Sequence, residues 1–341
     1  MKKNLAVGHF YNEPFIEACS PWIDRIREVF FAWPGVLSCR PAPVFDDQVR
    51  ERLYSDLRWC RENGILLDTL FNCNCYGDNA ISCELADFVT DTLNDMKSKG
   101  LFPDVVTTTS PFIATVLRDR FPQVKIRGSV NLRVHGTLGF EYVDDLFDSF
   151  YVSREHQRDF AYMRHCAKWA KEHNKILGMQ LNSGCLRQCP YQQFHDNLHG
   201  HNRIRQSGVG EKFDFSVFLC KKTYARKNYE AFLKATWIRP EDAPLFEDSV
   251  SVMKLATRRI ANPTKILNAY ASYHYDGNLL DLMDPVHSEF FAPYIIDNSA
   301  FPADWATSGI GGECANNCTE CGKCAAILAK VLRLPNESVG K

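Results

Sequence analysis

Hydrophobic residues recur along this chain in short runs rich in Val, Ile and Phe, and each run is followed by a longer stretch in which apolar residues return with helical spacing. This alternation predicts repeated strand–helix units. The main predicted helices are Asp47–Glu62, Ser82–Lys99, Pro111–Phe121 and His156–Asn174. The eight predicted strands are Leu5–Phe10, Gly35–Cys39, Ile65–Phe71, Val105–Thr109, Lys125–Asn131, Phe150–Ser153, Ile176–Asn182 and Val250–Ala256.

Eight such alternations in 341 residues favour an α/β fold of the (β/α)8 TIM-barrel type. A doubly wound open sheet would give the same alternation, and the strand count and chain length decide for the barrel. We expect a barrel-like catalytic domain over 1–298, with a long insert at about 185–248, and a cysteine-rich C-terminal segment over 299–341. Long inserts in such folds commonly carry function.

Charge and composition narrow the class of protein. Forty basic side chains balance 41 acidic ones, so no global field attracts nucleic acid or anionic lipid. The charged start imitates a signal peptide, but its apolar stretch is only three residues long before Gly8. No run approaches the roughly 18 apolar residues of a membrane helix, so a cytoplasmic location without membrane contact is expected. Fourteen cysteines in a reducing compartment are then ligands, catalytic thiols or small buried residues.

The densest cysteine pattern lies in the C-terminal segment of the sequence. Cys314, Cys318, Cys321 and Cys324 form a Cys-x3-Cys-x2-Cys-x2-Cys run, and four thiolates this close can meet at one centre if the backbone wraps around it. The close spacing resembles ferredoxins and favours an iron–sulfur cluster, [4Fe-4S] in type, over the zinc alternative or unligated thiols. The centre would serve either as an electron relay or as a staple that holds the tail.

A second cysteine group follows the seventh predicted strand. Cys185 and Cys189 form a Cys-x3-Cys pair at the expected functional face of a barrel, and Cys220 is the predicted third ligand. The fourth ligand is left open among Cys75, a C-terminal cysteine and no protein group at all. Three-cysteine ligation of an iron–sulfur cluster leaves an iron that is open to substrate. The alternative is that these cysteines are buried apolar thiols. The chain therefore holds one cluster or two.

Just downstream, His195, Asp196 and His199 are candidate catalytic residues. The two histidines are four residues apart and share one face if the segment is helical. They would then bind a divalent metal or act as a general base, and the alternative is that they are ordinary polar surface residues.

Candidate substrate-binding residues also follow predicted strands. Asn72 and Asn74 come after the third strand, where they either contact substrate or hold a turn. Cys73 and Cys75 are too close in sequence to chelate one metal together. Lys254 and Arg258 bracket the end of the eighth strand, where barrels often bind phosphates or carboxylates, although surface charge explains them too.

The segment Lys212–Arg239 combines basic and aromatic residues. This pattern is found in surfaces that grip an RNA backbone and stack bases. A helix with an aromatic inner face and a basic outer face explains it as well, and we favour that interpretation. The interleaved aromatic residues include Tyr224, Tyr229, Phe232 and Trp237.

Four segments in this order resemble the collagenase-like peptidase family, number thirty-two among peptidases of unknown catalytic type. They are Asn182-Ser183-Gly184-Cys185, Phe194-His195-Asp196-Asn197-Leu198, Lys254-Leu255-Ala256-Thr257-Arg258 and Gly277-Asn278-Leu279-Leu280. The likeness extends over most of residues 5–290. It implies a barrel-like fold and, as in several members, a [4Fe-4S] cluster that serves oxygen-independent hydroxylation of ubiquinone precursors, tRNA or rRNA.

The sequence also departs from that family. Cys185 and Cys189 are spaced more closely than the family's cysteine pair, and the Cys314–Cys324 run lies outside the family's core pattern. What the resemblance transfers is that Cys185, Cys189 and Cys220 occupy the region where members ligate iron.

We therefore expect an iron–sulfur redox enzyme that hydroxylates a small molecule or an RNA base and receives electrons from a donor protein. The alternatives are a zinc- or cluster-stabilised module that binds RNA or protein, and a peptidase as the family name implies.

Overall fold

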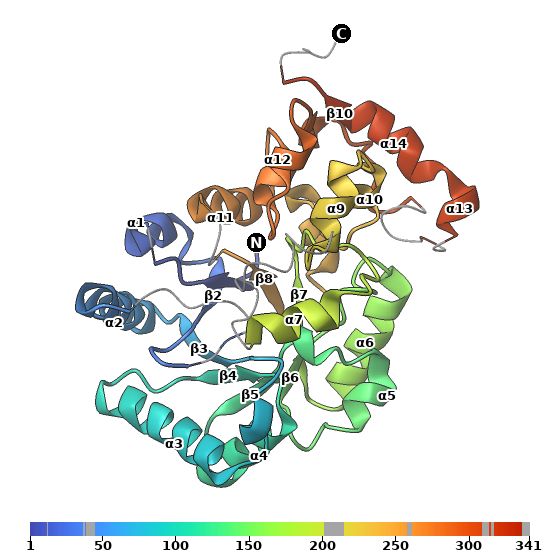
Figure 1. The fold of residues 1–341 in the computed structure, drawn as a ribbon. Helices are drawn as coiled ribbons and strands as arrows, with labels where there is room; N and C mark the ends of the chain where they lie inside the picture. The colour runs from blue at the N-terminus through green and yellow to red at the C-terminus, as the bar shows by residue number, and fades with distance from the viewer. Residues whose placement is uncertain are drawn as a thin grey trace.

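Eight parallel strands pair in chain order, and the eighth pairs with the first to close a barrel (Figure 1). The structure is a computed structural model and describes residues 1–11, 13–36, 38, 45–200, 215–257, 261–308, 314 and 317–335. Closure confirms the predicted (β/α)8 barrel and excludes the doubly wound sheet. The strands are β1 Leu5–Gly8, β2 Ile26–Phe31, β3 Leu66–Phe71, β4 Val105–Thr108, β5 Lys125–Gly128, β6 Ser149–Tyr151, β7 Ile176–Gln180 and β8 Val252–Leu255.

The predicted second strand, Gly35–Cys39, is wrong. Gly35 lies in a turn with a φ of +83°, and Leu37 and Cys39 lie outside the described residues. The second strand is β2, which carries Arg27 and Glu28 between apolar residues. The other seven predicted strands coincide with observed ones apart from shifted ends.

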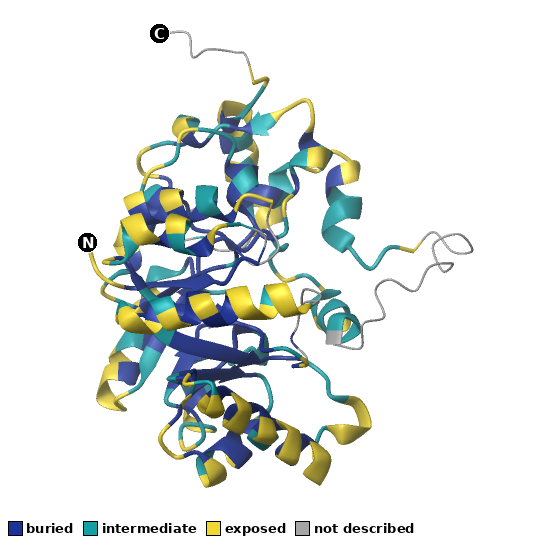
Figure 2. Cartoon of the chain, turned by 90° about the vertical axis from the view of Figure 1, so that its left-hand side faces the viewer, coloured by how far each residue is buried: buried dark blue, intermediate teal, exposed yellow. Residues whose placement is uncertain are grey.

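The helices between the strands begin where the sequence supplies caps. Side chains of Asp46, Ser82, Ser110 and Asp159 accept hydrogen bonds from backbone amides of the first helical turns. All four helices predicted from the sequence are confirmed. Figure 2 shows that the strands are buried while the outer faces of the helices are exposed. The helices around the barrel are α1 Phe15–Cys19, α2 Asp47–Glu62, α3 Cys83–Ser98, α4 Pro111–Arg120, α5 Gly136–Glu141, α6 Phe160–Glu172 and α11 Pro263–Ser272.

The insert between β7 and β8 and the C-terminal part of the chain pack together (Figure 1). The insert contributes α7 Gln192–Gly200, α9 Leu219–Ala225, α10 Glu230–Leu233 and the 3-10 helix η4 Pro240–Phe246. The C-terminal elements are α12 Ser288–Phe291, β9 Ile295–Ile296, α13 Cys318–Cys321, α14 Lys323–Val331 and β10 Leu332–Arg333. Helix α12 packs against α9, and α14 packs against α10. Within the described ranges, no helix has the length and apolar character needed to cross a membrane.

A network of buried charges occupies the barrel interior. Arg127 Nη2 donates to Glu28 Oε2 at 2.9 Å, and Nη1 donates to the other oxygen of Glu28. Arg127 Nη1 also lies 3.3 Å from Asp68 Oδ2, which accepts a 2.8 Å hydrogen bond from Thr107 Oγ1. Burial raises the pKa of Asp68, and the positive charge of Arg127 opposes that rise. Buried carboxylates are tolerated only when they are paired, and this pairing explains why β2 carries a glutamate.

Tyr151 and Lys254 lie beside this network. Lys254 Nζ lies 4.2 Å from the Phe30 ring centroid and 5.0 Å from that of Tyr151. Gly178 on β7 makes room for the tyrosine, since a Cβ there would lie 2.6 Å from Tyr151 Cε1. The interior therefore combines charge pairing with close ring packing.

A buried histidine joins the end of β1 to α2, and it predicts how stability depends on pH. His9 Nε2 lies 2.9 Å from Asp56 Oδ2, and burial lowers the pKa of His9 although Asp56 opposes the shift. The unfolded chain binds a proton on this histidine near pH 6.5, whereas the folded protein binds it only at lower pH. We therefore expect the stability that neutral His9 contributes to be lost as pH falls below about 6.5.

The measurement is the free energy of unfolding of parent and His9→Asn between pH 7.5 and 5. The variant should show a shallower loss below pH 6.5, by up to about 1.4 kcal/mol per pH unit. Equal slopes for the two proteins would contradict this assignment.

Candidate functional site

The chain after β7 is held tightly at the barrel mouth, which we define as the carboxyl-terminal end of the eight strands. The side-chain amide of Asn182 donates two hydrogen bonds. One goes to Ala256 O, just after β8, at 3.1 Å, and the other to Leu282 O, in the 3-10 helix η5 Leu279–Leu282, at 2.9 Å. The Gly184 amide donates to Asp284 O at 2.9 Å. These bonds fix the segment that leads into Cys185.

Gly184 is the tightest point of this segment. A Cβ there would lie 2.6 Å from Pro285 O and 3.1 Å from Met283 Cβ. We expect Gly184→Ala to displace the Cys185 loop and to lower the free energy of unfolding by about 1–3 kcal/mol. Denaturant unfolding and the rate at which a thiol reagent labels Cys185 would measure both effects, with Cys185→Ser to identify the labelled thiol. Parent-like stability and labelling would show that the loop has more room.

Three cysteines gather around this loop. Cys185 and Cys189 are partly buried in it, and Cys220 comes from α9, 35 positions after Cys185. Burial, together with the Cys185 and Cys189 thiols, raises the pKa of Cys220 to about 11. Burial and Cys185 likewise raise the pKa of Cys189. The Cys185 and Cys189 thiols thus lie near enough to that of Cys220 to act on it electrostatically, and the role of the three as metal ligands stays a prediction.

Whether this group suits a metal is decided by the kind and the spacing of its donors. Thiols are the ligands that iron–sulfur clusters and zinc prefer, and no disulfide joins these three. Among the described residues, no three His, Cys, Asp or Glu side chains are already close enough to hold a metal ion. The three thiols are therefore suited to a metal by their chemistry, but in this structure they are not arranged as a metal site.

Two buried polar groups beside the cysteines were missed by the sequence analysis. Tyr224, on α9, is fully buried, and Cys220 and Cys185 both act on its hydroxyl group electrostatically. The His287 ring lies 4.7 Å from that of Tyr224 at an angle of 59°, and its Nε2 lies 3.0 Å from Gly184 O. Tyr224 Oη and His287 Nδ1 have no hydrogen-bond partner among the described residues. Burial lowers the pKa of His287 to about 4, so this ring is neutral at pH 7.

Arginine side chains approach the same loop. Arg154, from the segment after β6, places Nη1 3.4 Å from Ser183 Oγ and 3.8 Å from Cys185 Sγ. Glu155 accepts a 2.6 Å hydrogen bond from the Gln188 amide. Arg154 and Glu155 therefore both contact the Cys185 loop.

Helix α7 carries the predicted catalytic residues. His195 and His199 do share one face, with ring centroids 4.7 Å apart, and His195 also meets the Phe218 ring edge-on at 5.0 Å. Asp196 accepts a 2.7 Å ion pair from Arg133 Nη2 in the segment after β5. This ion pair ties α7 to the segment after β5, two strands from β7 in the barrel. Asp196 therefore positions the helix, and the catalytic role of the two histidines stays a prediction.

The predicted substrate-binding residues lie in different settings. Asn72 and Lys254 are buried, and Arg258 lies outside the described residues. Asn74 exchanges side-chain hydrogen bonds with Asn131 after β5, donating to its backbone oxygen at 3.4 Å and accepting from its amide at 3.3 Å. Asn74 thus holds the turn after β3. Cys73 donates to Cys75 O at 2.9 Å, which is a local turn contact.

Four aromatic residues of the basic segment pack inward. Tyr224, Phe232 and Trp237 are fully buried, and the partly buried Tyr229 ring lies 4.5 Å from that of Phe291, whereas Phe215 is exposed. The three buried rings are therefore unavailable for stacking on RNA bases. This favours the interpretation in which the aromatic face belongs to the core.

The terminal cysteines are placed by α13 and α14. Cys318 and Cys321 are exposed, and Cys314 and Cys324 are partly buried. Gly309–Gly312, which precedes them, lies outside the described residues.

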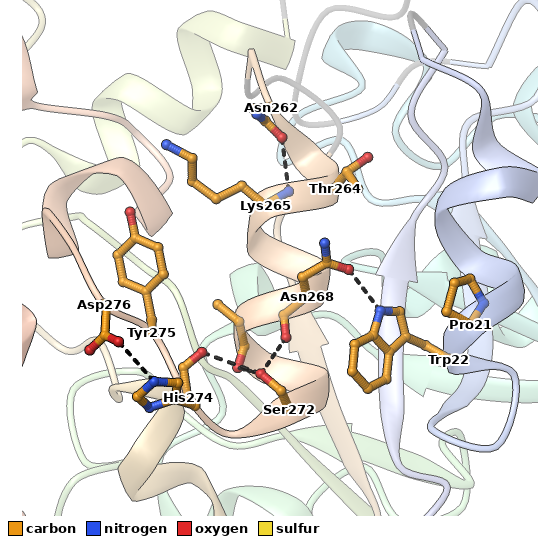
Figure 3. Close-up of a pocket in the computed structure, with 11 residues that line it drawn as sticks. Pro21, Trp22, Asn262, Thr264, Lys265, Asn268, Ser272, His274, Tyr275 and Asp276 are labelled. Atoms are coloured by element: carbon orange, nitrogen blue, oxygen red, sulfur yellow. Dashed lines mark hydrogen bonds and ion pairs between the residues drawn. The ribbon is translucent and has the colours of Figure 1, made fainter.

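A pocket of about 740 Å³ opens on the flank of the barrel between the 3-10 helix η1 Ser20–Trp22 and α11 (Figure 3). Its polar groups bond one another: Trp22 Nε1 donates to Asn268 Oδ1 at 2.7 Å, and His274 Nε2 lies 3.1 Å from Asp276 Oδ2. The pocket lies away from the barrel mouth and holds none of the predicted site residues. We assign no function to it.

Comparison with known proteins adds two likenesses. No protein-family model matches the chain. The chain is 21% identical, over 90% of its length and 89% of the relative's, to a protein named as an uncharacterized protease of Methanocaldococcus jannaschii. In structure it resembles a U32 peptidase, with a TM-score of 0.52 and 13% identity, over 74% of this chain and 92% of that one. An endo-beta-1,4-mannanase from Thermotoga petrophila is similar over 53% of this chain and 61% of its own, with 12% identity and a TM-score of 0.35.

The relative resembles nearly the whole chain, and the solved peptidase has the same barrel. The predicted resemblance to the collagenase-like peptidase family, U32, is therefore confirmed.

Proposed function

We propose that the chain is an iron–sulfur redox enzyme that hydroxylates a small molecule or an RNA base without oxygen. The observation that supports it is the gathering of Cys185, Cys189 and Cys220 at the barrel mouth, each half-buried and the latter two with raised pKa values. Burial and neighbouring thiols raise the pKa of such cysteines because they disfavour the negatively charged thiolate. A bound metal cation compensates that charge, so these thiols can serve as metal ligands. Zinc is the alternative metal for the same thiols.

We assign the other roles in this reaction to residues around these thiols. A bound cluster would supply one-electron chemistry at the mouth. Arg154 would contact Cys185 and hold its loop in place, and His195 or His199 would hold or move a proton on α7. Lys254 and Arg258 remain our candidates for contact with an anionic group of the substrate, and Asn72 for a hydrogen bond to it. The electrons would come from a donor protein.

The test is iron and sulfide analysis of protein purified without oxygen, with electron paramagnetic resonance of the reduced sample. About four irons per chain would mean one cluster, and about eight would mean two. A colourless, iron-free protein would contradict the proposal. Zinc in its place would favour the metal-stabilised binding module.

A peptidase is the second candidate, because the relative is named a protease and the similar structure a U32 peptidase. The buried His9–Asp56 pair resembles a base and its orienting acid, but Phe15 and Tyr11 enclose the imidazole instead of a Ser or Cys nucleophile. The check is hydrolysis of a fluorogenic peptide library by the metal-free protein. Cleavage that disappears in a single Ser or Cys variant would favour the peptidase over the redox enzyme.

A further inference from the structure

Helix α7 bridges the barrel mouth between the ends of two strands. It follows the loop of Cys185 and Cys189, which comes after β7, and its Asp196 pairs with Arg133 in the segment after β5. Strands β5 and β7 are separated by β6 in the barrel. In Figure 1, α7 passes in front of the barrel strands. The helix therefore lies over part of the mouth, beside the loop that carries the two cysteines.

Helix α7 buries very little apolar surface. None of the side chains from Gln192 to His199 is buried, and Phe194 is 49% exposed. Helix α6, in the wall of the barrel, instead buries four side chains, Met163 and Trp169 among them. Burial of an apolar face provides most of the free energy that holds a helix in a protein. Helix α7 therefore gains little stability from its packing.

The aromatic contacts of α7 are loose as well. The Phe194 ring lies 6.3 Å from that of Phe215, which is 40% exposed, and His195 meets the edge of Phe218 at 5.0 Å. Both of these partners belong to the stretch that leads into α9. Segments with few buried apolar contacts open at a low cost in free energy. The packing of α7 therefore opposes its opening only weakly.

The ion pair of Asp196 with Arg133 supplies a tie that packing does not. Arg133 Nη2 lies 2.7 Å from Asp196 Oδ2, and the two side chains are only 28% and 16% exposed. Partly buried charges are screened less by salt than fully exposed ones. This pair therefore holds α7 against the segment after β5.

The chain just before α7 is fixed in place. The Gly184 amide donates to Asp284 O at 2.9 Å, and the Gln188 amide donates to Glu155 Oε2 at 2.6 Å. These bonds hold the cysteine loop at both of its ends. If the ion pair breaks, α7 can therefore swing away about the residues that follow Gln188, while the loop stays in position.

We propose that α7 is a lid over the barrel mouth, hinged between Gln188 and Gln192 and held closed by the ion pair of Arg133 with Asp196. Closed, it shields the cysteine loop from water, and open, it admits molecules from solution to that loop. Asp196 is then the residue that closes the lid. Only the identity of what enters, the substrate of the redox enzyme, rests on the proposed function.

The first test is hydrogen–deuterium exchange of the full chain as purified, read by mass spectrometry on a peptide that covers α7. Asp196→Asn and Arg133→Gln should each speed exchange of the α7 amides about fivefold at low salt, because each removes the ion pair. The reversed pair, Arg133→Asp with Asp196→Arg, should restore part of the protection. Asp87→Asn, which breaks the pair of Asp87 with Arg120 between α3 and α4, is the matched control and should leave α7 unchanged.

Salt provides a test that needs no substitution to succeed. Between about 0.02 M and 0.5 M NaCl the Debye length falls from roughly 20 Å to 4 Å, which weakens the ion pair. Exchange of α7 should therefore quicken with salt in the parent. It should not respond to salt in Asp196→Asn, where no pair is left to screen.

Thiol labelling shows whether the opening uncovers the loop. After any metal has been removed with a chelator, N-ethylmaleimide should label Cys185 and Cys189 about fivefold faster in Asp196→Asn than in the parent. Cys83, exposed at the start of α3, should be labelled at the same rate in both and serves as the internal control.

Exchange of α6 in the same spectra shows that each variant is folded. Equal exchange of α7 in the parent and in both single variants, without any response to salt, would overturn the ion pair as the tie that closes the lid. Faster exchange of α7 without faster labelling of Cys185 and Cys189 would overturn the lid itself, because the helix would then move without uncovering the loop. An iron-free protein that shows all of these effects would contradict the proposed function and leave the lid intact.

Discussion

Replacing Arg127 by methionine is expected to lower the free energy of unfolding by about 3–5 kcal/mol. Arg127 is the cation that pairs with Glu28 and also contacts Asp68, and all three side chains are buried inside the barrel. Methionine fills similar space but leaves these carboxylates without that partner, and a buried unpaired charge is costly. Urea denaturation, followed by the shift in midpoint, measures the loss.

The matched control is Arg120→Met, because Arg120 forms an exposed ion pair with Asp87 at 3.0 Å. Exposed pairs contribute roughly 0–1 kcal/mol, so this variant should remain close to the parent. Adding Glu28→Leu to Arg127→Met should recover part of the stability, since it removes the stranded charge. Equal effects of the Arg127 and Arg120 variants would show that the interior network contributes little.

Changing Cys220 to serine is expected to remove most of the metal at the barrel mouth. Cys220 comes from α9 and reaches Cys185 and Cys189 only through the tertiary fold, so its loss should leave two adjacent thiols that hold a metal poorly. Iron or zinc per chain, measured by elemental analysis after anaerobic purification, reports the change.

Cys83→Ser is the control, because Cys83 is exposed at the start of α3 and lies on another part of the barrel. It should leave the metal content unaltered. Cys318→Ser with Cys321→Ser should also leave metal at the mouth, because the two cysteine groups are expected to be separate centres. If that double change removes all iron while the barrel stays folded, the groups share one cluster.

The barrel could be predicted because its strands are local apolar runs separated by helices with sequence-encoded caps. The second strand could not. Its Arg27 and Glu28 interrupt the apolar run, and the burial of Glu28 depends on Arg127, 99 positions away. A pairing at that distance leaves no local signal, so the nearby Gly35–Cys39 run was predicted instead.

Part of the candidate site likewise could not be predicted from the sequence. Cys185 and Cys189 could be predicted to lie at the mouth because they follow a strand, while their role and that of Cys220 as ligands stays a prediction. His287 and Tyr224 lack such a signal, since only the packing of α9 against α12 makes them buried neighbours of the cysteines. His9 directly follows β1, and its position at a strand end is the one signal that a closer look at the sequence offers.

The pairing of β1 with β8 sets the order in which the chain can fold during synthesis. Ala6 finds its partner Lys254 only after about three quarters of the chain has been made, because the two positions are 248 residues apart. Until then β1 and β7 each have one edge whose backbone N–H and C=O groups are unpaired. Such strand edges promote aggregation because they can pair with another chain. Cys185, Cys189 and Cys220 all leave the ribosome before β8. A nascent chain therefore exposes these thiols while its barrel is still open.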